Sequence, residues 1–150
     1  MFLIDPNKAP QGAYAAFSSQ KCHGDTAVLR AQEIMERDLA NELSVDVVAQ
    51  RVALSRRTFA RRFVGATGNT PREYLQRARI EAAKRALESG GSVAEVAFNV
   101  GYTDPVAFRK TFTQRTGLTP ADYRSRYGPR TEPAWLDKAA RRPRGRLATR

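Results

Sequence analysis

The sequence contains 150 residues, and its 26 lysines and arginines outnumber 15 acidic residues, which gives a formal net charge of +11. Hydrophobic residues make up 41% of the chain, enough for a core, so wholesale disorder is excluded and one domain or two small ones are expected. No apolar run approaches the ~20 residues of a transmembrane helix, and the N-terminus lacks the pattern of a signal peptide. The single Cys22 cannot form an internal disulfide, so a reducing cytoplasm is the expected compartment.

The positive charge favours a polyanionic partner, most often nucleic acid. Residues 128–150 hold seven basic and two acidic residues, a net of +5, and residues 25–127 hold 17 basic and 12 acidic residues, again +5. Nearly half of the excess therefore lies in the C-terminal segment, and a basic tail or a surface charged for solubility stays open as the alternative. The charge of the middle region must be well placed if it serves binding.

Three regions follow one another along the chain. Residues 1–24 contain prolines and glycines without a lasting period, and we expect an irregular lead-in there. Residues 25–127 have helical periodicity and no β-alternation, so the predicted class is all-α with about seven helices. Residues 128–150 have three prolines and an arginine-rich end, which predicts a basic disordered tail.

The first three helices are predicted from periodic apolar residues and capping chemistry. The first runs from about Asp25 through the stretch DTAVLRAQEIMERDLANEL, which ends at residue 43. Ser44 can cap a short second helix. Ser55 can cap a third helix that ends at Gly68, where glycine turns left-handed without strain.

The remaining four helices begin at similar signals. Thr70 and Glu73 form a capping box with proline at the first helical position, which opens a long helix to about residue 89. Ser92 and Glu95 form a second capping box after a Gly-Gly break. The last two helices are predicted to start at Asp104–Pro105 and Thr119–Pro120, the first of them ending at Gly117.

The chain carries an internal repeat. FARRFVGATGNTPREYL, residues 59–75, returns in varied form as FRKTFTQRTGLTPADYR, residues 108–124, at a spacing of 49, whereas the preceding short helices match at a spacing of 48. One residue is therefore inserted near positions 103–107. Each copy predicts a helix-turn-helix with a bracing third helix. A helical array of the tetratricopeptide kind is the alternative, but such arrays need about three repeats to bury a core.

A helical wheel separates the repeated residues from the varied ones on the second helix of each copy. The repeated phenylalanines share the buried side, and the varied side chains point outward: Arg57, Arg61 and Val64 in copy one, and Val106, Lys110 and Thr113 in copy two. Arginine can fork to guanine, and valine or threonine can contact a thymine methyl. The pattern predicts one scaffold used twice to read two different DNA sequences, with a merely solvated charged face as the alternative.

The helix between the copies is expected to act as a spacer. Its seventeen-residue stretch PREYLQRARIEAAKRAL would span roughly 25 Å. That length is of the right order to set two readers about one DNA turn, ~34 Å, apart.

A resemblance to the DNA-binding domain of AraC/XylS-type transcription regulators is carried by LSRRTFARRFVGATGNTPREYLQRARIEAAKRAL and VAEVAFNVGYTDPVAFRKTFTQRTGLTPADYR, over residues 25–127. It implies a sequence-specific regulator of double-stranded DNA. Subdomains 25–69 and 91–127, joined by a linker helix over 70–90, would insert recognition helices into successive major-groove segments of an asymmetric site. It also implies RNA polymerase as a further partner, no cofactor, no metal, and a bacterial cytoplasmic, nucleoid-associated location.

The resemblance also implies which residues contact DNA. The base-reading candidates, carried over by position, are Arg57, Ala60, Arg61, Val106, Arg109 and Lys110. The candidates for contacts to the DNA backbone are Ser55, Arg56, Arg62, Thr103 and Thr113. Because two readers in one chain replace the two halves of a dimer, the isolated domain is expected to be a monomer.

Two departures from the family pattern lie in the first copy. Ala53 stands where Gly101 sits in copy two, so a positive φ there would be strained by about 1 kcal/mol; we expect the turn to adjust instead. Ala60 cannot make a polar base contact, so the first helix would rely on its two arginines.

The N-terminal segment carries a second, shorter resemblance. MFLIDPNKAPQGAYAAF followed by HGDTAVLRAQ resembles the junction in regulators that place a class I glutamine amidotransferase-like sensor domain before the DNA-binding unit. It implies that this chain is the C-terminal part of a larger regulator.

Two other classes of function compete with DNA binding. Cys22 and His23 are the only thiol and the only imidazole, but neighbours in sequence usually point apart, and two such groups fall short of a zinc site. We therefore expect no catalytic residues. A module that binds a protein partner instead of DNA is the second rival, and retention on random duplex DNA with strong salt dependence would separate the two.

Overall fold

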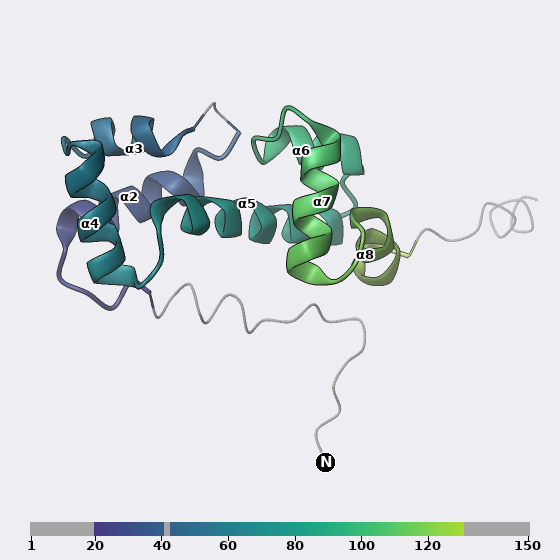
Figure 1. The fold of residues 1–150 in the computed structure, drawn as a ribbon. Coiled ribbons are helices and arrows are strands. Elements are labelled where there is room, and N and C mark those ends of the chain that lie inside the picture. The colour runs from purple at the N-terminus through teal and green to yellow at the C-terminus, as the bar shows by residue number, and fades with distance from the viewer. Residues whose placement is uncertain (1–19, 41–42, 131–150) are drawn as a thin grey trace, which may run out of the picture.

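A computed structural model describes residues 20–40 and 43–130, which form seven α-helices and no strands (Figure 1). This confirms the all-α prediction. The helices are α2 (Thr26–Arg37), α3 (Val45–Arg51), α4 (Arg56–Thr67), α5 (Pro71–Glu88), α6 (Val93–Asn99), α7 (Pro105–Thr116) and α8 (Pro120–Tyr127). Residues 1–19 and 131–150, on which most of the predicted lead-in and tail fall, lie outside the described residues. No helix in the described part of the chain combines the length and the apolar character that crossing a membrane requires.

Local capping chemistry sets the start of every helix. A side-chain oxygen just before each helix accepts a backbone N–H from its first turn; these N-caps are Asp25, Ser44, Ser55, Thr70, Ser92, Asp104 and Thr119. Helices α5, α7 and α8 have proline at the N-terminus. Gly68 and Gly117 end α4 and α7 at φ 74° and 78°, in the left-handed region. These signals were predicted from the sequence, and the structure confirms them.

Helix α2 is shorter than its sequence pattern predicted. It ends at Arg37, not near residue 43, and Asp38 leaves helical geometry at φ −102°, ψ 29°. Leu39 and Leu43 are both buried in the first core, and Asp38 pairs with Arg51 of α3. The helix thus ends just before the segment that buries these two leucines.

The buried apolar side chains form two clusters. One gathers residues from α2, α3, α4 and the first half of α5, and is built around Phe59, Phe63 and Tyr74. The other gathers residues from the second half of α5 and from α6 to α8, around Phe108, Phe112 and Tyr123. We call these groups of helices unit 1 and unit 2. Helix α5 belongs to both, because it braces unit 1 and opens unit 2.

The repeat extends to the contacts inside each cluster. Ring centroids of Phe63 and Tyr74 lie 5.3 Å apart, and those of Phe112 and Tyr123 lie 5.4 Å apart. Each tyrosine hydroxyl also donates to a glutamate of the helix that opens its unit: Tyr74 to Glu36 of α2 at 2.7 Å and Tyr123 to Glu88 of α5 at 2.5 Å. Burial and this carboxylate raise the pKa of both tyrosines. The unit that is repeated is therefore four helices long, with α5 shared.

The inserted residue is Thr103. The turn between α3 and α4 covers residues 52–55 and the turn between α6 and α7 covers residues 100–104, so the second is one residue longer. Leu54 and Tyr102 make the same backbone bond in the two turns, to Ala49 and Ala97. The extra residue stands just after Tyr102 and before the N-cap of α7.

The turn of unit 1 does not avoid the left-handed conformation. Ala53 has φ 57°, and Gly101 at the matching position has φ 94°. The expectation that the turn would adjust around alanine is therefore wrong. The helix-turn-helix geometry requires a left-handed residue here, and the chain accepts alanine in that conformation because the rest of the turn is fixed by its hydrogen bonds.

Candidate nucleic-acid interface

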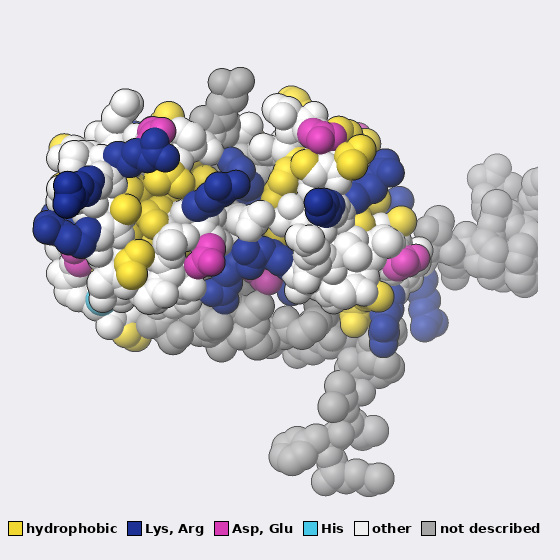
Figure 2. Space-filling view, in the orientation of Figure 1, with side chains coloured by type: hydrophobic (Ala, Val, Ile, Leu, Met, Phe, Trp, Pro, Cys, Tyr) yellow, Lys and Arg dark blue, Asp and Glu magenta, His cyan; other side chains and the backbone are white. Residues whose placement is uncertain are grey.

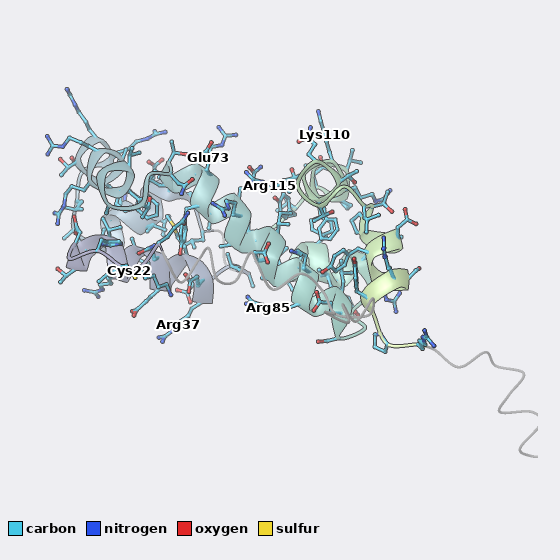
Figure 3. All side chains as sticks on the ribbon, turned by 90° about the horizontal axis from the view of Figure 1, so that it is seen from below. Cys22, Arg37, Glu73, Arg85, Lys110 and Arg115 are labelled. Atoms are coloured by element: carbon cyan, nitrogen blue, oxygen red, sulfur yellow. The ribbon has the colours of Figure 1, made fainter. Side chains whose placement is uncertain are left out.

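Helices α4 and α7 are the second helices of the two units, and they lie on the same side of α5. In Figure 1 both run from top to bottom, α4 beside the start of α5 and α7 in front of its second half, and Figure 3, turned by 90°, shows both nearly end-on along the same edge. Each helix packs its phenylalanines into its own cluster in the same way. Their outward faces therefore point in the same direction.

The outward face of α4 is basic. Phe59 and Phe63 are fully buried, whereas Arg57 and Arg61 are exposed and Val64 is 43% exposed. The sequence predicted this division of the helix. The third base-reading candidate, Ala60, is only partly exposed beside them. Helix α4 thus presents two guanidinium groups one turn apart, and the side chains beside them, Ala60 and Val64, are small and apolar.

The outward face of α7 is chemically different. Val106 is 68% exposed, and Arg109 and Lys110 are exposed as predicted. Lys110 points away from the rest of the molecule in Figure 3, while Arg115 lies nearer to α5. Asp104 caps α7 by accepting from the backbone N–H of Val106 at 2.9 Å, which brings a carboxylate to the start of this helix. The two outward faces therefore differ in shape and in charge.

Basic side chains are gathered on the face that carries both helices. Figure 2 shows several Lys and Arg groups around α4 and a further one at the middle of α7. By contrast, Arg37 and Arg85 extend from other sides of the molecule in Figure 3. The face of α4 and α7 is therefore a basic surface of the kind that contacts phosphates.

The candidates for contacts to the DNA backbone differ in exposure and in the hydrogen bonds and ion pairs that their side chains already make. Ser55 and Thr103 are exposed, with the Ser55 hydroxyl also capping α4. Arg56 is exposed and lies 3.3 Å from Asp46, a surface ion pair of little energetic weight. The Thr113 hydroxyl donates to the carbonyl oxygen of Arg109 at 2.7 Å, so its methyl group is the part left for contact with a ligand.

Arg62 has a different environment from the other candidates. Its Nε and Nη2 donate to the two carboxylate oxygens of Asp25 at 2.9 and 2.7 Å. The Arg62 hydrogen bond lowers the pKa of Asp25, and the same bond raises the pKa of Arg62. This bidentate pair occupies one edge of the guanidinium, so the Arg62 side chain, which is 38% exposed, has only its other edge left for a phosphate. Sequence periodicity could not reveal the pair, because its partners are 37 residues apart.

Comparison with known proteins agrees with this geometry. A family profile described as a helix-turn-helix domain matches residues 48–126. A Streptomyces lividans protein described as an AraC-like transcription regulator is 40% identical over 101 residues, which cover 67% of this chain and 33% of that protein. The transcriptional activator RhaS of Escherichia coli is 35% identical over 91 residues, covering 60% of this chain and 33% of RhaS. The chain thus spans about a third of the length of these relatives.

Solved structures give the same result. The DNA-binding domain of AdpA, a global transcriptional factor solved in complex with a target DNA, superposes with a TM-score of 0.63 at 33% identity, covering 81% of this chain and 100% of that one. The C-terminal domain of the response regulator AraT from Geobacillus stearothermophilus gives a TM-score of 0.67 over 73% of this chain and 93% of that one. At 23% identity, the second likeness shows the fold alone.

Proposed function

Because this chain belongs to the helix-turn-helix domain family in its AraC-type form, we propose that it is the sequence-specific DNA-binding part of a transcription regulator. Helices α4 and α7 enter successive major-groove segments on one face of double-stranded DNA. The observation that carries this proposal is the pair of parallel helices whose buried residues are repeated while their exposed residues differ.

Each recognition helix reads its own segment. In α4, Arg57 and Arg61 fork to guanine O6 and N7, with Ala60 fitting between them. In α7, Val106 contacts a thymine methyl, and a basic pair beside it, Arg109 and Lys110, makes polar contacts to bases or phosphates.

Contacts to the DNA backbone come from the edges of these helices. Ser55, Arg56, Thr103 and Thr113 hold phosphates beside the two grooves, which positions the readers without adding sequence information. Arg62 holds Asp25, the N-cap of α2, against α4 through one edge of its guanidinium and contacts the DNA backbone through the other edge.

The wider organisation of the protein is also part of the proposal. Residues 25–69 and 91–127 are the two reading subdomains, and residues 70–90 are the linker. The chain binds DNA as a monomer and contacts RNA polymerase in the cytoplasm, at the nucleoid. The resemblance of residues 1–32 supports a sensor domain of the glutamine amidotransferase type ahead of this part in the complete regulator.

The test is binding of the chain to random duplex DNA at different salt concentrations, followed by selection of preferred sites. With roughly six to eight phosphate contacts, affinity should fall about a thousandfold or more between 50 and 200 mM salt. Selected sites should contain two unlike boxes about 10 bp apart. A salt-independent affinity for duplex DNA would contradict the proposal and favour a module that binds protein.

A further inference from the structure

The two units share little apart from helix α5. Each has its own cluster of buried apolar side chains, and Ala82 of α5 packs against both. Apolar packing therefore fixes each unit on α5 but contributes little to contact between the units. The relative placement of α4 and α7 then depends on the polar contacts made where the units meet.

Arg79 lies near the middle of α5, at this meeting point. Its Nη2 donates to the carbonyl oxygen of Leu43, just before α3, at 2.8 Å. Its guanidinium carbon lies 5.8 Å from the centroid of the Tyr102 ring, in the turn before α7, which is a cation–π distance. Tyr102 in turn packs on Phe108 of α7, with 5.3 Å between ring centroids. One side chain thus joins the backbone of unit 1 to the aromatic cluster beneath α7.

Holding Arg79 in this place has an energetic cost. Burial lowers the pKa of Arg79, and its Nε is buried without a hydrogen-bond partner in the part of the chain that the structure describes. Burying an incompletely paired charge opposes folding, and an apolar side chain would avoid that penalty. The stability of α5 alone therefore does not account for arginine here, whereas a geometric role does.

Gly101 shows that the units are in direct contact beside Arg79. A Cβ atom at Gly101 would collide with the carbonyl oxygen of Leu39 and would lie 3.2 Å from Nε of Arg79. The matching turn of unit 1 accepts Ala53 at a positive φ, so the turn geometry by itself does not demand glycine. The close approach of unit 1 does.

A second polar contact lies one turn away on the same face of α5. Arg115, in the last turn of α7, donates from Nη2 to Oε1 of Gln76 at 2.7 Å. Residues 76 and 79 are three apart and share a helix face. The contacts of Arg79 and Gln76 therefore align along the side of α5 that carries α7.

We propose that Arg79 is a positioning residue that fixes the angle and separation of α4 and α7, and so sets the spacing between the two DNA boxes that the protein accepts. The claim about the spacing of the DNA boxes rests on the proposed function. The claim about the placement of α4 and α7 can be measured without DNA, so an experiment can contradict either claim without the other.

The DNA-free experiment measures the distance between spin labels on α4 and α7. Labels are attached at Gly65→Cys and Gln114→Cys, both exposed positions, in a Cys22→Ser background that leaves no other thiol. The unaltered Arg79 protein should give a narrow distance distribution. Arg79→Met keeps an unbranched apolar stem but loses both contacts, and it should broaden the distribution.

Two variants complete the design. Arg72→Met removes an exposed arginine from the same helix and should leave the distribution narrow. Arg79→Lys keeps the charge, but a single ammonium group lacks the planar fork that reaches the Leu43 carbonyl while stacking on Tyr102. Arg79→Lys should give a distance distribution of intermediate width. If Arg79→Met does not fold, Arg79→Lys still tests the proposal.

The DNA experiment uses duplexes that carry the two selected boxes at their preferred spacing and at spacings changed by two base pairs. Such a change turns one box away from its helix, so the unaltered protein should lose about tenfold or more in affinity. Arg79→Met should lose less than about threefold, because its units can readjust. Arg72→Met should weaken binding equally at all spacings, since it removes charge only.

Unchanged label distances in both Arg79 variants would overturn the proposal, whatever the DNA result. A lower melting temperature of Arg79→Met, combined with unaltered label distances and spacing preference, would mean that Arg79 only stabilises the fold. If the unaltered protein bound no duplex, the proposed function would fail, and a broadened distribution in Arg79→Met would still support the placement of the helices by Arg79.

Discussion

The tight turns of the two units have the same backbone bonds but different residues at the left-handed position. Leu54 donates to the Ala49 carbonyl oxygen at 3.0 Å, and Tyr102 donates to that of Ala97 at 2.9 Å. Alanine in the left-handed region costs roughly 1–2 kcal/mol relative to the right-handed region, and glycine does not. Ala53 is exposed, so this strain is not offset by packing of its methyl group.

Ala53→Gly should therefore stabilise the protein. Relief of backbone strain outweighs the greater freedom of glycine in the unfolded chain, and the net gain in the free energy of unfolding should be about 0.5–1 kcal/mol. Urea denaturation of the two proteins measures it. Gly101→Ala is the matched control and should destabilise, because it adds both the strain and a collision with Leu39. A loss of stability in Ala53→Gly would contradict this account of the turn.

The pair of Asp25 and Arg62 makes stability depend on pH. The pKa of Asp25 is lowered in the folded protein by its hydrogen bonds to Arg62. A carboxyl group with a depressed folded pKa stabilises the fold above its unfolded pKa, about 4, and loses this contribution as the pH falls through the folded value. The pair should thus be fully effective at neutral pH and ineffective in strong acid.

Asp25→Asn tests this dependence without removing the helix cap, because asparagine caps helices about as well as aspartate. The variant should have a lower melting temperature than the unaltered protein at pH 7, and the difference should shrink as the pH falls from about 5 toward 2. Thermal unfolding followed across this range gives the result. A difference that stayed constant with pH would show that the charge of Asp25 does not act through Arg62.

At the scale of helices, α4 and α7 share their buried phenylalanines but differ on their outward faces. Arg61 of α4 and Lys110 of α7 are exposed on unlike surfaces, one formed by two arginines and one by a valine with two basic neighbours. Loss of a bidentate contact to guanine typically costs about 1–3 kcal/mol and relaxes preference at that base pair. Each helix should therefore control a separate part of the site.

Arg61→Ala should weaken binding by about 1–3 kcal/mol and relax base preference in one box, leaving the other unchanged. Lys110→Ala or Arg109→Ala should affect the second box in the same way. Site selection from random duplexes with each variant measures both effects. If a variant lost the same affinity on all sequences, its side chain would hold a phosphate and the bases would be read elsewhere.

The sequence predicted the helices well because their signals are local. Ser44, Ser55 and Thr70 cap helices through residues three positions away, and a motif of that length is visible in the chain itself. The burial of Phe59 and Phe108 was also predicted locally, from the helical spacing of the repeated phenylalanines. The end of α2 was predicted too late, because it depends on where Leu39 and Leu43 are buried and not on nearby residues.

The contacts that position the interface could not be predicted, because they join residues far apart in sequence. Arg62 meets Asp25 across 37 residues, and Arg79 meets Leu43 across 36. No periodicity links such residues, so the sequence suggested a phosphate contact for Arg62 and no contact for Arg79. The sequence predicted α5 as the bracing third helix of copy one and as a spacer, but not that its second half forms part of the second buried cluster.

For the whole molecule, we expect the parallel direction of α4 and α7 to determine the symmetry of the DNA site. A symmetric dimer of helix-turn-helix proteins places its readers in opposite directions and requires a palindrome. Here both readers run the same way along α5 and differ in their outward residues (Figure 1). One chain should therefore recognise two unlike boxes that are read in the same direction.

This arrangement predicts how the protein responds when one box is inverted in place. The first box and the spacing are kept, and the second box is replaced by its reverse complement. A rigid pair of parallel helices cannot present α7 to an inverted box, so affinity should fall to that of a single box, about a hundredfold or more below the intact site. The intact complex should contain one chain per duplex, as measured by sedimentation. Retained affinity on the inverted site, or two chains on one duplex, would mean that the units bind as separate readers or as a dimer, and that α5 does not fix their direction.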